Sequence, residues 1–112
     1  MTEISYDSTQ LQIADTTVEL RYPVANVIEI EDVIIVLLKV PPEYIDNCNV
    51  MAFNQDGSHC WTIESASNGN RDNPYMTITE NNGKLLAEAW NGLRYTVDLK
   101  SGEIRDGEIH RF

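Results

Sequence analysis

The sequence predicts an all-β domain in which two four-stranded antiparallel sheets pack together. Three dipeptides, Asp56-Gly57, Asn82-Gly83 and Asn91-Gly92, are flanked by residues typical of strands. Such dipeptides suit the positive φ angles of a type I′ hairpin turn. The chain has 112 residues, of which 42% are apolar and 23% are charged. This length and composition allow one domain with one hydrophobic core.

Eight strands follow when the chain is read outward from these turns. Lys100-Ser101-Gly102 indicates a further, slightly longer turn, and Glu31-Asp32 indicates a turn without glycine, whose register stays open. Residues 9–13 and 17–22 add one or two N-terminal strands, which Pro23 ends. The eight expected strands cover residues 24–30, 33–40, 49–55, 58–64, 75–80, 84–90, 93–99 and 103–109.

The single domain of residues 1–112 is therefore expected to have four parts. The N-terminal strands lie in residues 1–23, the first sheet in 24–64, a polar linker loop in 65–74 and the second sheet in 75–112. The prolines of Pro41-Pro42-Glu43-Tyr44-Ile45 favour a single helical turn inside a loop of the first sheet.

The two predicted sheets contain similar runs. Val50–Trp61 and Tyr95–Ile104 each join an aromatic strand to a polar residue, a glycine turn and a short strand. This pattern, over residues 24–109, resembles the blade repeat of quinoprotein-type and related β-propellers. The resemblance implies blade-like sheets, and because two blades cannot close a ring, they would pack as a half β-propeller or a β-sandwich.

Turn geometry predicts which side chains share a face. A two-residue turn at Asn91-Gly92 would put Trp90, Glu88 and Leu86 on the inner face of the second sheet. Glu88 would then be a carboxylate among apolar groups. It would either be a structural residue, hydrogen-bonded to a partner or placed at the edge of the apolar face, or else a functional carboxylate. The same rule, applied to a two-residue turn at Asn82-Gly83, places Tyr75 beside Trp90.

The first sheet carries large apolar groups on both faces if Phe53 pairs with Cys60 and Ala52 with Trp61. Such a sheet is either covered on both sides or offers one side as a binding surface. In this register Cys60 belongs to the core.

The sequence offers little for catalysis, so we expect no enzyme, no catalytic residues, no metal site and no cofactor. His59 and His110 are the two histidines, and neither has a partner at metal-ligand spacing. Cys48 and Cys60 do not form a Cys-x-x-Cys pair. The N-terminus has no signal-peptide pattern and Val33–Leu38 is too short to cross a bilayer, which favours a cytoplasmic protein.

The formal net charge of −10 favours a basic protein partner and disfavours nucleic acids and anionic membranes. The acidic clusters are either a solubilising surface or a docking face with aromatic anchors. The candidate anchors are Tyr44 and, if either stays exposed, Trp61 or Trp90. The candidate partner-binding residues are Glu29, Glu31, Asp32, Glu43, Tyr44, Asp46, Asp72 and Glu80.

The chain also resembles short two-blade bacterial proteins, loosely the immunity proteins of polymorphic toxin and contact-dependent growth inhibition systems. That resemblance, with the charge, implies an inhibitor that covers the basic active site of a cognate toxin, expected to be a nuclease. Two alternatives stay open. One is an oligomerising scaffold with a weak homodimer, and the other is a small-ligand or carbohydrate binder using Trp61 and Trp90.

Overall fold

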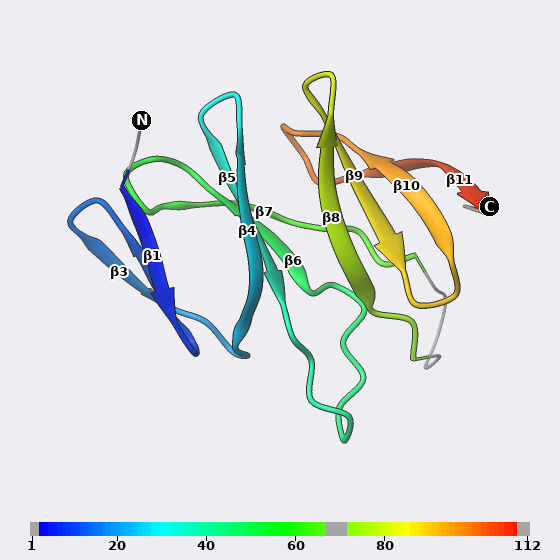
Figure 1. The fold of residues 1–112 in the computed structure, drawn as a ribbon, viewed down its shortest axis with the longest axis horizontal. Coiled ribbons are helices and arrows are strands. Elements are labelled where there is room, and N and C mark those ends of the chain that lie inside the picture. The colour runs from blue at the N-terminus through cyan, green and yellow to red at the C-terminus, as the bar shows by residue number, and fades with distance from the viewer. Residues whose placement is uncertain (1–2, 67–71, 110–112) are drawn as a thin grey trace.

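The computed structural model describes residues 3–66 and 72–109, which form eleven strands and no helix (Figure 1). The predicted all-β class is therefore confirmed. No helix in this part of the chain is long and apolar enough to span a bilayer. Residues 67–71, half of the predicted linker over 65–74, and His110 lie outside the described residues.

The strands form three antiparallel sheets, each built from strands consecutive in the chain. The first sheet contains β1 (Ile4–Asp7), β2 (Gln10–Ile13) and β3 (Thr16–Glu19). The middle sheet contains β4 (Val24–Ile30), β5 (Val33–Leu38), β6 (Val50–Phe53) and β7 (His59–Thr62). The third sheet contains β8 (Tyr75–Asn81), β9 (Lys84–Ala89), β10 (Leu93–Val97) and β11 (Ile104–Ile109).

The two predicted four-stranded sheets are thus present, and the N-terminal strands form a third sheet of their own. Strand β1 was not predicted. Its turn to β2 and the turn from β2 to β3 use Ser8 at φ 55° and Ala14 at φ 51° instead of glycine. The sequence therefore carries no glycine signal at either turn, although Leu11 and Ile13 alternate as a buried strand requires.

The middle sheet is covered on both faces, which confirms the first of the two readings of its apolar pattern. Strand β5 shows this most clearly, because five of its six residues are buried although successive side chains point to opposite faces. Ile34, Val36 and Leu38 pack with Leu11 of the first sheet. Their neighbours on β5 point the other way, toward the third sheet.

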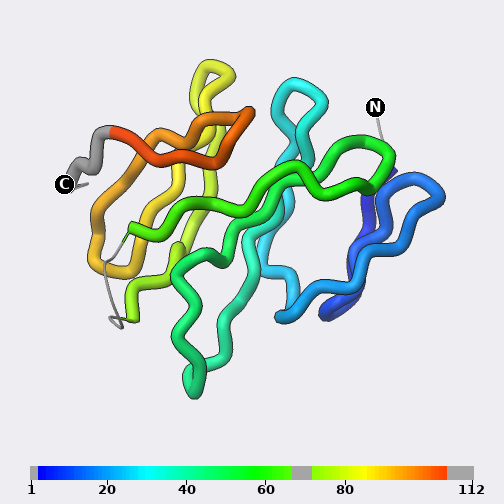
Figure 2. The backbone as a smooth tube through the Cα atoms, turned by 180° about the vertical axis from the view of Figure 1, so that it is seen from behind, coloured from blue at the N-terminus to red at the C-terminus, as the bar shows by residue number. Residues whose placement is uncertain are grey.

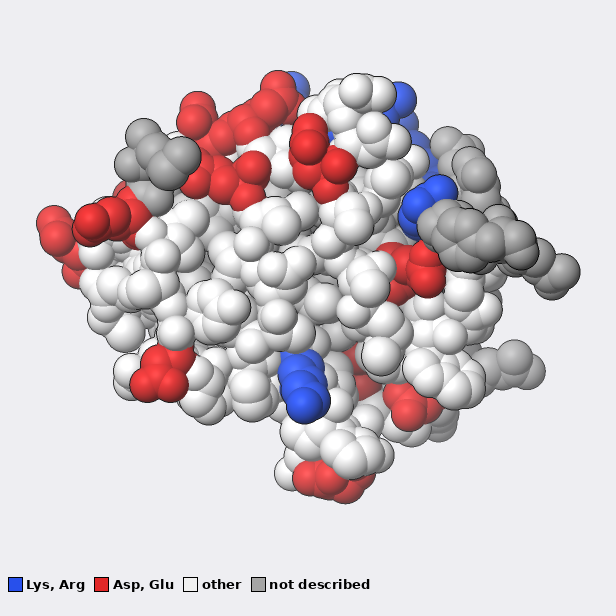
Figure 3. Space-filling model, in the orientation of Figure 1, with Lys and Arg blue, Asp and Glu red and all other residues white. Residues whose placement is uncertain are grey.

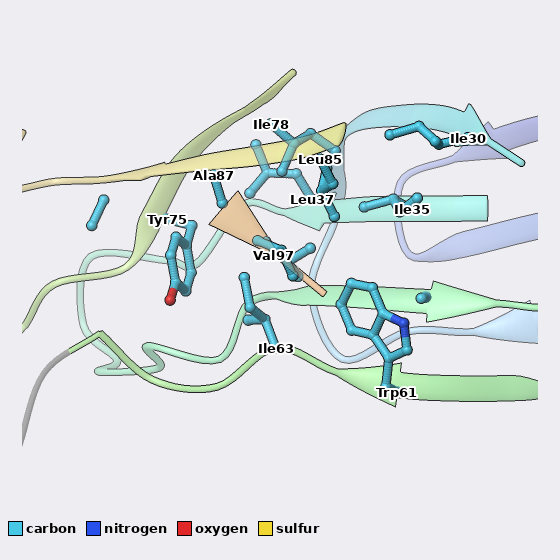
Figure 4. Packing of buried hydrophobic residues seen from close by; sticks show 13 residues of the cluster. Ile30, Ile35, Leu37, Trp61, Ile63, Tyr75, Ile78, Leu85, Ala87 and Val97 are labelled. Atoms are coloured by element: carbon cyan, nitrogen blue, oxygen red, sulfur yellow. The ribbon is translucent and has the colours of Figure 1, made fainter. Parts of the chain in front are cut away.

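The larger core lies between the middle and third sheets (Figure 4). In this cluster Trp61 of β7 and Ile63, which follows β7, pack with Tyr75 and Val97 of the third sheet. Full burial of each large apolar side chain is worth about 1.5–3 kcal/mol. The apolar layer therefore holds the two sheets together.

Buried asparagines join the middle and third sheets at one end of this layer. The Asn49 amide donates to the carbonyls of Leu38 at 2.9 Å and Tyr75 at 2.8 Å, and its oxygen accepts from the Tyr75 N–H at 2.9 Å. Asn47 accepts from the Asn73 N–H at 2.8 Å. Because these groups are buried, leaving one without its partner would cost about 1–3 kcal/mol.

The repeat seen in the sequence corresponds to equivalent hairpins that dock in the same way (Figure 2). In the β6–β7 turn, a Cβ on Gly57 would come within 2.5 Å of Thr16 of the first sheet. In the β10–β11 turn, a Cβ on Gly102 would come within 2.6 Å of the Trp61 ring of the middle sheet. Each of these turns therefore presses its glycine onto the last strand of the preceding sheet.

The predicted register at Asn91-Gly92 is wrong by one residue. Gly92 N–H donates to Ala89 C=O at 2.9 Å, so the turn has three residues, and Tyr95 lies opposite Ala87. The buried face is consequently that of Leu85, Ala87 and Ala89. Trp90 is left in the turn, 69% exposed.

Two related expectations change with this register. Glu88 is half-buried opposite Arg94, away from the inner apolar face. A bulge in β8 places Tyr75 opposite Ala89 instead of Trp90, and its ring packs edge-on against Tyr95 at 6.5 Å.

The predicted pairing of Ala52 with Trp61 is confirmed, whereas the pairing of Phe53 with Cys60 is wrong. A bulge places Phe53 opposite His59 and leaves Cys60 as the extra residue, which is exposed instead of in the core.

The outward faces of the first and third sheets are polar. The first sheet presents Ser5, Asp7, Gln10, Gln12 and Thr17 around one shallow surface. The third sheet carries the Arg105 and Asp98 ion pair at 3.6 Å. Polar outer faces end a stack of sheets, because a further sheet would have to desolvate them.

The close approach at Gly102 gives a stability prediction. Gly102→Ala should lower the free energy of unfolding by about 2–4 kcal/mol, because φ is +79° and the Cβ would overlap the Trp61 ring. Gly83→Ala is the matched control, since φ is +80° there with nothing within 4 Å. The Gly83→Ala variant should lower the free energy of unfolding by about 1 kcal/mol. Chemical denaturation measures both, and equal losses would contradict the proposed packing.

Candidate functional site

The candidate partner-binding residues fall at two opposite ends of the molecule. Strands alternate in direction, so the β2–β3, β4–β5, β6–β7, β8–β9 and β10–β11 turns lie at one end, here called the upper end (Figure 1). The other connections lie at the lower end. Glu29, Glu31, Asp32 and Glu80 are at the upper end, and Glu43, Tyr44, Asp46 and Asp72 are at the lower end.

Three turns of the upper end are joined by side-chain hydrogen bonds. Gln55 of the β6–β7 turn donates to Asp32 at 3.0 Å and to Glu29 at 3.3 Å. Thr16, next to the β2–β3 turn, donates to the Asp56 carbonyl at 3.0 Å. These contacts fix the three turns relative to one another. Five exposed acidic residues on these turns or next to them form what we call the acidic rim: Asp15, Glu29, Glu31, Asp32 and Asp56.

The acidic rim has no basic side chain within it among the described residues. Residues 3–66 contain eleven acidic and two basic residues. Both basic residues, Arg21 and Lys39, belong to lower-end connections. Figure 3 shows the acidic groups gathered along the upper left edge, over the first and middle sheets.

One rim carboxylate, that of Asp56, is held in its charged form by hydrogen bonds from Ser58. The Ser58 hydroxyl donates to Asp56 at 2.6 Å and the Ser58 N–H at 2.9 Å. These hydrogen bonds lower the pKa of Asp56 below its ordinary value. Glu80, on the neighbouring β8–β9 turn, accepts from the Gly83 N–H at 2.6 Å.

The centre of the rim is a strained turn. Ile30 pairs with Val33, which leaves Glu31 at φ 48° and Asp32 at φ 69° as a two-residue turn. Non-glycine residues in this left-handed region cost about 1–2 kcal/mol each. The β8–β9 hairpin makes the equivalent turn with Asn82-Gly83, the favoured pair. The chain thus carries two acidic residues where Asn-Gly would fold more easily. Backbone strain of this kind is often found at functional sites.

At the lower end, Asp46 is bound within the protein. Its carboxylate accepts from Arg21 at 2.7 Å and from the Cys48 N–H at 3.0 Å. Partial burial on its own would raise the pKa of Asp46, but the Arg21 hydrogen bond, the Cys48 N–H and the Arg21 charge together lower it. The structure therefore places Asp46 in a structural ion pair, whereas Glu43 and Asp72 are exposed.

The exposed apolar side chains also gather at the lower end. Tyr44, Ile45, Met76 and Trp90 are each more than half exposed. Trp90 N–H donates to Pro74 C=O at 2.9 Å, so its turn lies beside the start of β8. The aromatic anchors expected beside the acidic clusters are therefore separated from the rim.

A family model described as a domain of unknown function, DUF7957, matches residues 1–109. The chain belongs to the DUF7957 family. No curated protein and no solved structure matches the chain. The match spans all three sheets, so the DUF7957 domain includes the N-terminal sheet that completes the acidic rim.

The nucleophilic and metal-binding side chains that the structure describes in this DUF7957 domain do not converge. Burial and the nearby Asp46 charge raise the pKa of the half-buried Cys48 thiol, which disfavours the thiolate. His59 hydrogen-bonds Thr62 across 2.9 Å at the surface. Within residues 3–66 and 72–109, no three His, Cys, Asp or Glu side chains form a group able to hold a metal ion.

The two tryptophans do not share a pocket. Trp61 is 5% exposed in the core, and its indole N–H donates to the Leu99 carbonyl at 2.7 Å. Trp90 lies in a lower-end turn. A carbohydrate site built on both rings, as one alternative required, does not form.

Some rim residues were missed from the sequence alone. Asp15 and Asp56 were not among the candidate partner-binding residues. Gln55 was not considered, because those candidates were chosen mainly by charge and Gln55 is uncharged. The signal that could have found them is the alternation of strand direction, which puts every second turn at the same end of a meander.

The strained turn gives a second stability prediction. Glu31→Asn with Asp32→Gly should raise the free energy of unfolding by about 1 kcal/mol, because it relieves backbone strain and repulsion with Glu29. The reciprocal change, Asn82→Glu with Gly83→Asp, should lower it by a similar amount. Denaturation of both variants checks this, and a destabilised first variant would mean that the Gln55 contact outweighs the strain.

Proposed function

We propose that this DUF7957 domain is an immunity protein that neutralises a cognate nuclease toxin by covering its basic active site. The observation that supports the proposal is the acidic rim, in which five exposed carboxylates lie on three linked turns with no basic side chain among them.

The chemistry of the partner follows from the rim. A nuclease must present cationic groups to hold the phosphates of its substrate. An acidic surface complements those groups, steers the encounter and raises the association rate at low salt. Because the turns are already fixed by Gln55 and Thr16, little conformational entropy would be lost on binding.

In this proposal the domain acts by occlusion, without catalysing a reaction and without a cofactor or a nucleic-acid ligand. It acts in the cytoplasm, where an incoming nuclease would reach its substrate. Glu80 extends the contact toward the third sheet, and the lower-end residues Glu43, Tyr44 and Asp72 stay outside it.

Charge reversal tests the proposal. The triple variant Glu29→Lys, Glu31→Lys, Asp32→Lys should weaken binding to the toxin encoded beside this gene by about 1 kcal/mol per residue, or roughly a hundredfold in total. Calorimetry measures the affinity, and degradation of RNA and plasmid DNA measures the inhibition. Binding of the natural chain should also weaken as salt is raised.

The control variant has the same change in net charge at the lower end: Asp7→Lys, Glu43→Lys, Asp72→Lys. It should bind and inhibit almost as the natural chain does. If both triple variants lose affinity equally, the effect comes from net charge and the rim is not the interface. If the natural chain does not bind the toxin at low salt, the immunity function is wrong.

A second candidate is an oligomerising scaffold, and the exposed apolar groups of the lower end favour it. Met76 is 52% exposed and Trp90 is 69% exposed. Beside Met76 lies a mostly apolar cleft of about 190 Å³, lined also by Ala25, Val40 and Pro74. Such groups would give a homodimer an apolar centre.

Sedimentation velocity over a range of protein concentrations tests the scaffold. A scaffold would sediment as a dimer at high concentration, and Met76→Ser with Trp90→Ser would make it monomeric. Tyr6→Ser, which removes another exposed aromatic group, should leave the dimer intact. A natural chain that stays monomeric throughout would contradict the scaffold.

A further inference from the structure

The third sheet carries a surface of opposite charge to the acidic rim. A cleft of about 570 Å³ opens at its upper end, between the β8–β9 and β10–β11 turns. Its charged lining consists of Lys84, Lys100, Arg105 and Asp98. Figure 3 shows basic groups at the upper right, apart from the acidic edge.

The strand register brings these cations together. Thr96 pairs with Leu86 on one side and with Arg105 on the other, so these three residues cross the outer face of the sheet in a row. Lys84 is two residues before Leu86 and therefore shares this face. Lys100 enters from the β10–β11 turn.

The cleft keeps an excess of positive charge. Among the described side chains, Asp98 is the one carboxylate in its lining, and one of its oxygens accepts the Lys100 N–H at 2.8 Å. The other oxygen lies 3.6 Å from Arg105, whose side chain is 65% exposed. Among the described residues, neither Lys84 nor Lys100 has an ion pair.

This arrangement is unusual for a chain with a net charge of −10. Eighteen acidic residues are available to pair with eight basic ones. Even so, two lysines and an arginine line the same cleft, and the described part of its lining holds a single carboxylate. Three adjacent cations that share one described carboxylate in an acidic protein favour an anion from outside the chain.

We propose that this cleft binds a small phosphate-bearing ligand. The guanidinium fork of Arg105 matches two phosphate oxygens, and the two lysine ammonium groups complement the remaining charge. A long polyanion is disfavoured, because it would have to run past the acidic rim. A small ligand stays within the cleft, and beyond about 8–10 Å the field of the rim is screened at physiological salt.

Titration of the natural chain with inorganic pyrophosphate, followed by amide ¹⁵N–¹H spectra, tests the proposal. Shifts should concentrate on residues 83–85, 96–100 and 105 and saturate. Lys84→Gln with Lys100→Gln and Arg105→Gln should weaken the apparent affinity at least tenfold while the spectrum of the other sheets stays unchanged. Lys39→Gln, which removes a lysine at the lower end, should bind as the natural chain does.

Three outcomes would overturn the site. The first is the absence of saturable shifts at 0.15 M salt. The second is shifts of equal size in the natural chain and the triple variant. The third is cleft shifts that follow protein concentration without pyrophosphate, because the occupant would then be the rim of a second copy. The first two outcomes leave toxin binding untouched, because the rim lies over the other two sheets. The third would make the rim a self-association surface that competes with the toxin.

Discussion

The middle sheet must bury both of its faces, and the rest of the structure depends on this constraint. Strand β5 is apolar at every position, so neither side of it can face water at low cost. The first sheet covers one face and the third sheet covers the other. The outward faces of the first and third sheets are polar where the structure describes them, so the apolar layers lie between the three sheets.

The acidic rim is a consequence of this stacking. Three meander sheets packed side by side bring alternate turns to the same end, where Gln55 and Thr16 connect them. The core therefore fixes the positions of carboxylates that are individually exposed. The same geometry separates the rim from the cationic cleft, so that one end of the molecule presents acidic groups over two sheets and basic groups over the third (Figure 3).

The sequence predicted the strands well where glycine marked the turns. The six strands β6 to β11 could be read outward from glycine turns, whereas β4 and β5 were read from the Glu31-Asp32 turn, which has no glycine and whose register stayed open. Strand β1 was missed, because Ser8 adopts positive φ in the β1–β2 turn without glycine. The register at Asn91-Gly92 was missed for a different reason. The same dipeptide serves two-residue and three-residue turns, and only packing of Ala87 and Ala89 against the core decides between them.

The candidate site could be predicted only in part from the sequence, for a related reason. Acidic residues are visible in a sequence, but which of them lie together depends on strand direction and on which sheets touch. Glu29, Glu31 and Asp32 are neighbours in the chain and stay together, whereas Asp56 joins them through strand pairing within the middle sheet. Asp15 joins them only because the first sheet stacks on the middle sheet. Asp46 looked equivalent to the others until its ion pair with Arg21, 25 residues away, was known.

We expect the three sheets to unfold as one cooperative unit, which is what holds the rim rigid. Native-state hydrogen exchange of the amides of β2, β5 and β9 in increasing denaturant measures this cooperativity. The protected amides of all three strands should share one opening free energy, equal to that of global unfolding. If β2 opens at a distinctly lower free energy than β5, the first sheet detaches independently, and the rim is not the fixed surface described here.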